Sequence, residues 1–213
     1  MTSTAPDPLA KALLPALMHG LNNATQLLAS LNALAAAGDG ERWLERRSAD
    51  LARTSAEIED LGYVLGVLAS ASGADLLGER RDARGLELVL GVVRSALRRS
   101  GAGLAPGPDP LPTLATSVGE GWELPWAVST LLWATAVDHA PGSALAWSLE
   151  GGEAGWVLAS TEPGGAAMAS VSGRVGDLLA GAHLDLGAGG WSLSLPGPWL
   201  RPGEEQAPAL TLS

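Results

Sequence analysis

The chain has 213 residues, of which 46% are hydrophobic and 17% are charged, and its formal net charge is −10. A chain of this length and apolar content can bury a core of its own, as one large or two small domains, which argues against wholesale disorder. The negative charge argues against nucleic acid and anionic membranes as partners, and the absence of cysteine excludes disulfides, thiolate metal sites and a cysteine nucleophile.

The first predicted element is a long helix over residues 8–37. Apolar residues recur along it with a period of about 3.6 residues, at Leu13, Leu17, Leu21, Ala24, Leu28, Leu31 and Ala35. Asp7 and Pro8 form a favourable start, with the aspartate as N-cap and the proline at the first helical position. Pro15 removes one early backbone hydrogen bond, so we expect it to kink the first turns. Gly38-Asp39-Gly40 ends the helix.

A second helix is predicted over residues 41–71. Apolar residues are spaced by seven along it, as in a coiled-coil or bundle seam, at Leu44, Leu51, Ile58 and Leu65, with a second row at Leu61 and Leu68. Two long helices joined by a short loop pack antiparallel, and one such hairpin buries only one stripe of each helix. Further helices must therefore cover the hairpin, either from the same chain or from a second copy. We favour a second copy, which makes residues 1–75 a dimerisation domain with a four-helix bundle.

A polar connector over residues 72–84 leads into the second predicted domain, residues 85–213. An amphipathic helix fits residues 85–100, and residues 101–113 form a loop rich in proline and glycine. Residues 123–138 read as a buried helix. Short strands are predicted at 144–150, 156–160 and 191–195, with a turn at Gly151-Gly152 and a short helix at 175–182. This order predicts an α/β sandwich, so the expected fold class is α+β. The tail from Pro196 is expected to be loose.

His19 stands in a polar run that a helical core does not require. On an ideal helix, each residue turns by about 100°. The apolar residues of the first helix then share a sector of roughly 60°, and His19 lies about 120° or more from the centre of that sector. Its neighbours by rotation are Pro15, Asn22, Asn23, Gln26 and Ser30. We therefore expect His19 on the polar face, exposed to solvent. A surface histidine without a role is the alternative interpretation.

The run His-Gly-Leu-Asn-Asn-Ala-Thr-Gln-Leu-Leu, residues 19–28, resembles the phosphoacceptor box of two-component histidine kinases. That box commonly reads His-Glu/Asp-Leu-Asn-Asn-Pro, and the hairpin around it resembles the dimerisation and phosphotransfer module of these kinases. The second half is similar to their ATP-binding domain: residues 131–143 (LLWATAVDHAPGS) resemble its helix Leu-Leu-x-Asn-Ala-x-x-His-Ala-Pro-Gly, and residues 187–197 resemble its closing strand. The resemblance covers about residues 8–196.

Four departures from this family pattern indicate that ATP is not used. Gly20 stands where the kinases have an acidic residue, and Thr135 replaces the asparagine that holds magnesium, while His139 matches the later histidine. The family's Asp-x-Gly-x-Gly segment has no clear match, because Glu162-Pro163-Gly164-Gly165 reads better as an ordinary turn. The second glycine-rich lid is not evident in residues 173–181.

The resemblance therefore implies a degenerate histidine kinase that acts as a homodimeric histidine phosphotransferase, a phosphorelay protein of a two-component system. His19 would carry a phosphoryl group between the receiver domains of response regulators, whose own aspartate and magnesium assist the transfer. Asn22, Asn23 and Gln26 would orient the ring or the phosphoryl group, and the small Gly20 would let a partner approach. No cofactor of its own is expected.

Two alternatives come from other classes. One is a non-catalytic dimeric adaptor, a pseudokinase that binds a kinase or a receiver while His19 is never phosphorylated. The other is a working kinase that binds ATP in an altered pocket. Loss of an acid-labile label in His19→Ala, and thermal stability with and without ATP, would separate the three.

Other features of the sequence carry less chemistry. Asp138-His139 lacks a third ligand for a metal site, so no metal is expected. His183 and Asp185 are interpreted as a surface pair flanking a turn. No nucleophile elbow and no P-loop occurs. Residues 1–16 lack the basic region of a signal peptide, and no apolar run is long enough to span a membrane, so we expect a cytoplasmic protein.

Overall fold

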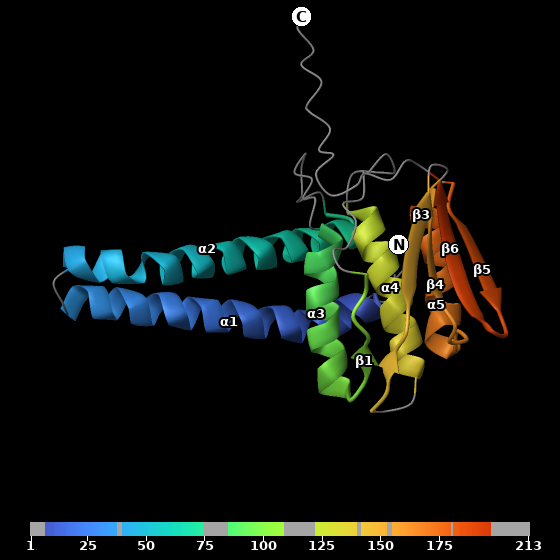
Figure 1. The fold of residues 1–213 in the computed structure, drawn as a ribbon, viewed down its shortest axis with the longest axis horizontal. Helices are drawn as coiled ribbons and strands as arrows, with labels where there is room; N and C mark the ends of the chain where they lie inside the picture. The colour runs from blue at the N-terminus through green and yellow to red at the C-terminus, as the bar shows by residue number, and fades with distance from the viewer. Residues whose placement is uncertain are drawn as a thin grey trace, which may run out of the picture.

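The computed structural model describes residues 7–37, 40–74, 85–108, 122–139, 142–152, 155–179 and 181–196. The described part of the chain contains helices and two sheets, which confirms the α+β class. Two long helices, α1 (Pro8–Ala37) and α2 (Gly40–Ala71), lie side by side and project from the rest of the molecule as a hairpin (Figure 1). None of the described helices is both long enough and apolar enough to cross a membrane.

The start of α1 is capped as its sequence predicts. Oδ1 of Asp7 accepts hydrogen bonds from the backbone N–H of Leu9 at 2.8 Å and of Ala10 at 3.4 Å. Its other oxygen, Oδ2, lies 3.2 Å from Nη2 of Arg174, far along the chain. The helix continues through Pro15. Gly40 already belongs to α2, while residues 38–39 of the predicted stop lie outside the described residues.

Helix α3 (Gly85–Ser100) contacts both helices of the hairpin and also α4 (Glu123–Asp138). The amphipathic pattern of α3 explains this position, because its buried face carries Val89, Leu90, Val93 and Leu97. Helix α4 is buried on nearly all sides, as its almost uniformly apolar sequence predicts. A single apolar cluster joins Leu13 and Val67 of the hairpin to Val89 of α3 and Leu131 of α4. The base of the hairpin and the second half of the chain therefore share one core.

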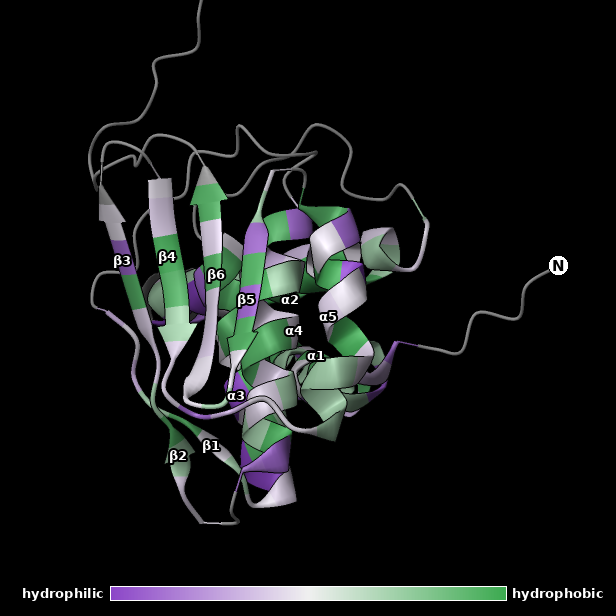
Figure 2. Cartoon of the chain, turned by 90° about the vertical axis from the view of Figure 1, so that its right-hand side faces the viewer, coloured by the Kyte–Doolittle hydropathy of each residue, from purple (hydrophilic) through white to green (hydrophobic). Residues whose placement is uncertain are grey.

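The larger sheet has four antiparallel strands in the order β3-β4-β6-β5: β3 (Ser148–Gly152), β4 (Gly155–Ser160), β6 (Gly190–Pro196) and β5 (His183–Gly187). Helices α4 and α5 (Ala166–Leu178) lie behind one face of it (Figure 2). Along β4, residues alternate between the two faces, so that Trp156 and Leu158 are buried while Val157 is exposed. Apart from Val157, the other face of the sheet carries mainly small and polar side chains, such as Ser148, Ala159 and Ser192.

A second, small sheet pairs β1 (Gly103–Leu104) with β2 (Ala144–Leu145) in parallel. This sheet was not predicted from the sequence. Residues 101–113 were predicted to be a loop, and residues 144–150 were predicted to be one strand where the structure has β2 and β3. Nε1 of Trp147 donates a hydrogen bond to the carbonyl oxygen of Ala105 at 2.9 Å, which ties these two segments together.

Three predictions for the second half differ from the structure. The helix expected at 175–182 is α5, which begins at Ala166 and ends at Leu178. The turn expected beside His183 and Asp185 is the strand β5, which contains both residues. Gly151 and Gly152 end β3 instead of forming a turn by themselves. Most of the polar connector and the tail beyond Pro196 lie outside the described residues.

Candidate functional site

His19 is exposed on α1, at the side of the helix where its rotation from the leucine stripe predicts it. Nδ2 of Asn23, one helical turn further on, lies 3.2 Å from Nε2 of the ring. When the amide donates, Nε2 is the accepting nitrogen and the ring proton is on Nδ1. In this tautomer Nε2 carries the single lone pair that accepts from the amide, and the same lone pair can act as a nucleophile once the amide turns away.

The other two expected polar residues do not reach the ring. Asn22 and Gln26 are exposed on the same side of α1, and within the described residues neither side chain has a hydrogen-bond partner. Of the three residues predicted to support His19, the structure therefore brings only Asn23 into contact with it. Asn22 and Gln26 remain available to a partner that covers this face.

Gly20 faces α2 and not the side of α1 that carries His19. A Cβ atom at this position would meet Cδ2 of Leu61 at 3.2 Å and Cδ1 at 3.3 Å, so Gly20 lies against α2. The expectation that it opens space for a partner beside His19 is wrong. Its physical role is to let α1 and α2 approach closely, because it lies about 100° from His19 around the helix and inside the apolar sector.

Charged residues line part of α2 nearer the tip of the hairpin. Asp50 accepts hydrogen bonds from Arg47 at 3.0 Å and from Arg53 at 2.9 Å. The hydrogen bond from Arg47 is the main cause that holds the pKa of the Asp50 carboxyl below its usual value, with further lowering from Arg53. Both pairs are exposed, and pairs of this kind contribute little to stability. These three residues give α2 a charged surface between the tip of the hairpin and the level of His19.

Thr135, the residue at the position of the kinase asparagine, is 2% exposed and buried in α4. Its hydroxyl donates a hydrogen bond to the carbonyl oxygen of Leu131 at 2.9 Å, within its own helix. Helix α5 packs along α4 through Met168, Val171 and Val175, all of which are buried. Thr135 therefore lies inside the fold, on a helix that packs against α5.

Asp138 and His139 contact the start of α5 instead of forming a separate site. Oδ2 of Asp138 accepts a hydrogen bond from the backbone N–H of Ala167 at 2.8 Å and so caps α5. Nδ1 of His139 lies 3.6 Å from Oε2 of Glu162. A Cβ on Gly165 would collide with the Asp138 carboxylate, so this position requires glycine. The sequence did not indicate this cap, because the two partners are far apart in the chain.

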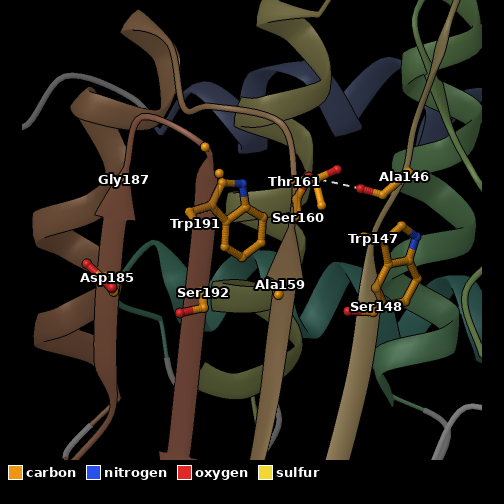
Figure 3. Close-up of a pocket in the computed structure, with 12 residues that line it drawn as sticks. Ala146, Trp147, Ser148, Ala159, Ser160, Thr161, Asp185, Gly187, Trp191 and Ser192 are labelled. Carbon is orange, nitrogen blue, oxygen red and sulfur yellow. Dashed lines mark hydrogen bonds between the residues drawn. The ribbon is translucent and has the colours of Figure 1, made fainter.

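A shallow hollow of about 360 Å³ lies at one end of the larger sheet (Figure 3). Four of its lining residues are consecutive partners across the strands, on the face turned away from the helices: Ser148, Ala159, Ser192 and Asp185. Their small side chains make the surface hollow. Around it, Ser160 donates to the carbonyl oxygen of Ala146 at 2.9 Å. The hollow contains none of the predicted phosphoacceptor residues.

Among the described residues, no group of three histidine, cysteine, aspartate or glutamate side chains could hold a metal ion. No protein-family model matches the chain. A comparison with curated proteins gives no significant match either. The assignment of a function therefore depends on the geometry around His19 and on the resemblance of the run that contains it.

Proposed function

We propose that the chain is a histidine phosphotransferase, in which His19 accepts a phosphoryl group from the aspartyl phosphate of one receiver domain and passes it to the aspartate of another. The observation that carries this proposal is the exposed imidazole on a long hairpin, with the amide of Asn23 at its Nε2 atom. An exposed ring on a rigid helix meets the main requirement of a relay, since the partner supplies the other catalytic groups.

The transfer step balances with the groups available. The unprotonated Nε2 attacks phosphorus, an N–P bond forms, the P–O bond of the acyl phosphate breaks, and the receiver carboxylate leaves with the electron pair. The reverse sequence loads the second receiver. Once Nε2 has reacted, the Asn23 amide is within reach to donate to a phosphoryl oxygen, which would replace its hydrogen bond to the ring. Magnesium comes with the receiver.

A second copy of the chain completes the hairpin in this proposal. Residues spaced by seven form one stripe on each helix: Leu14, Leu21, Leu28 and Ala35 on α1, and Leu51, Ile58 and Leu65 on α2. Leu14 is 47% exposed, and the others are only half-buried. In an antiparallel hairpin these two stripes lie on the same side, while His19 is about 180° around α1 from that side. A four-helix bundle built on the stripes leaves the histidine free.

A degenerate ATP-binding domain is the companion part of the proposal. It is supported by the hydroxyl of Thr135, which is buried and donates within its own helix, and by the packing of α5 on α4. The sandwich would then serve as a scaffold that holds the hairpin base. We propose no ATP-dependent kinase activity.

The test is to incubate the protein with a receiver domain phosphorylated with ³²P and to look for an acid-labile label on the chain. His19→Ala should abolish the label without changing the circular dichroism spectrum, while His139→Ala and His183→Ala should keep it. Label that persists in His19→Ala would overturn the proposal, and so would wild-type protein that binds receivers but never becomes labelled.

One observation favours a non-catalytic adaptor as the second candidate. Asn23 is the one residue of the acceptor run that contacts the ring, because the position next to His19 is a glycine turned toward α2. In the adaptor function, receivers or kinases bind the same face with equal affinity for wild type and His19→Ala. The labelling experiment, combined with a binding measurement on both proteins, distinguishes the two functions.

A further inference from the structure

Strand β5 forms one edge of the four-stranded sheet (Figure 2). It pairs with β6 on one side, and no strand in the described ranges pairs with its other side. The backbone N–H and C=O groups along such an edge are available to a further strand. Proteins often guard an edge with lysine, proline, a bulge, a charged side chain or a short strand; β5, with the sequence His-Leu-Asp-Leu-Gly, has no lysine or proline, is short and carries one carboxylate, Asp185.

The side chains of β5 alternate between the two faces of the sheet. Leu184 is opposite the buried Leu193 and faces the helices, as does Leu186, which is nevertheless 49% exposed. His183 and Asp185 are on the other face and are exposed. Within the described residues, neither takes part in an ion pair or hydrogen bond through its side chain. The edge therefore presents one imidazole, one carboxylate and one bare leucine.

We propose that β5 pairs with β5 of a second copy, antiparallel and in a register centred on Leu184. This register places Leu184 opposite the partner's Leu184 and His183 opposite the partner's Asp185, twice by symmetry. It also brings the exposed Leu186 beside the partner's Ala182, on the face that the helices cover. The chain is therefore complementary to itself along this strand, because an imidazole N–H can donate to the carboxylate opposite it and the apolar residues face each other.

Neighbouring registers lack this complementarity. Centring on Asp185 would place two carboxylates directly opposite each other, which is unfavourable. A register that pairs Leu184 with the partner's Asp185 would place the helix-covered face of one copy and the open face of the other on the same side of the joined sheet. The contact involves one short strand, so we expect it to be weak and dependent on concentration. The pairing does not depend on the proposed helical bundle: a monomer, with one β5 edge, would form a dimer, and a bundle dimer, with two such edges, would form a tetramer or a larger assembly.

Sedimentation equilibrium over a range of concentrations tests the pairing. The mass of wild type should rise with concentration, and Asp185→Lys should lower the association constant about tenfold or more, because each His183 ring loses the carboxylate that faces it in the partner and meets an ammonium group instead. The exchange His183→Asp with Asp185→His keeps the complementarity and should keep the association. Glu150→Lys is the matched control, since it makes the same charge change on β3, at the opposite edge of the sheet.

Three outcomes would overturn the pairing. One is a wild-type mass that does not change with concentration. Another is equal association in wild type and Asp185→Lys. The third is loss of association in Glu150→Lys as well, which would indicate that β5 pairs with β3 of the next copy.

A cysteine cross-link tests the register directly, because the chain contains no cysteine. Leu184→Cys should form a disulfide-linked pair of chains under mild oxidation, since the register puts residue 184 opposite itself within disulfide range. Leu186→Cys is the control, because its counterpart is Ala182 and it should stay largely unlinked. Equal linking by the two variants, or none by Leu184→Cys, contradicts the register.

Discussion

Nδ2 of Asn23 and Nε2 of His19 are 3.2 Å apart on the exposed side of α1. If the amide holds the ring and then the phosphoryl group, Asn23→Ala should slow phosphoryl transfer to His19 by about three- to tenfold, the value of one hydrogen bond. The rate of label transfer from a phosphorylated receiver measures this. Asn22→Ala removes an amide that does not contact the ring and should leave the rate unchanged. Equal rates of transfer for the two variants would show that the Asn23 amide does not assist phosphoryl transfer.

The contact between Gly20 and Leu61 predicts a difference between two glycines of the hairpin. Gly62→Ala adds a methyl group to open space in α2 and should stabilise the protein by about 0.5–1 kcal/mol through helix propensity. Gly20→Ala must displace the end of Leu61, so its gain should be smaller or absent. Gly20→Leu should cost about 1–3 kcal/mol through overpacking. Urea unfolding monitored by circular dichroism gives these values, and equal effects of the two alanine variants would contradict the packing.

Asp138 and Gly165 form a coupled pair at the start of α5. Asp138→Ala should lower the free energy of unfolding by about 1 kcal/mol, because the N–H of Ala167 loses its cap. Gly165→Ala should cost about 1–3 kcal/mol in the wild type, and less in the Asp138→Ala background, where the colliding carboxylate is gone. The same urea experiment on all four proteins measures the coupling. Gly173→Ala, in the open part of α5, is the control and should not be destabilising.

The apolar stripes of the hairpin predict the effect of a charge at Ile58. If a second copy covers the stripe, Ile58→Glu should raise the dissociation constant of the dimer by at least about a hundredfold, because it buries an unpaired carboxylate. Ala56→Glu places the same group on the exposed opposite side of α2 and should have little effect. Light scattering after size-exclusion chromatography gives the mass. A wild-type protein with the mass of a monomer would contradict the four-helix bundle.

Much of the helical part could be predicted from the sequence, because its signals are local. The period of the leucines, the Asp7 cap and the apolar run of α4 give elements that agree with the structure within a residue or two. The rotation of His19 away from that stripe predicted its exposure. The same rotation places Gly20 in the apolar sector beside Leu13, so its contact with α2 was also available from the sequence.

The second half was harder because its elements depend on distant partners. Helix α5 contains Gly173 and Gly176 and has a weak helical pattern, and it starts where Asp138 supplies a cap from another helix. Strand β5 has only five residues and is defined by its pairing with β6. The parallel pair β1–β2 joins segments about forty residues apart. The local pattern of apolar and polar residues does not indicate these contacts, because their partners lie far away in the sequence.

The shared core at the base of the hairpin affects how the molecule can be divided. Leu13 and Val67 are fully buried against residues of α3 and α4, so a fragment containing only residues 7–74 would expose them to water. Such a fragment would tend to aggregate through the apolar residues at the base of the hairpin. The helix that carries His19 is thus held by the core that it shares with α3 and α4. A protein that bound the hairpin at His19 would meet helices whose orientation relative to the second half of the chain is fixed by this core.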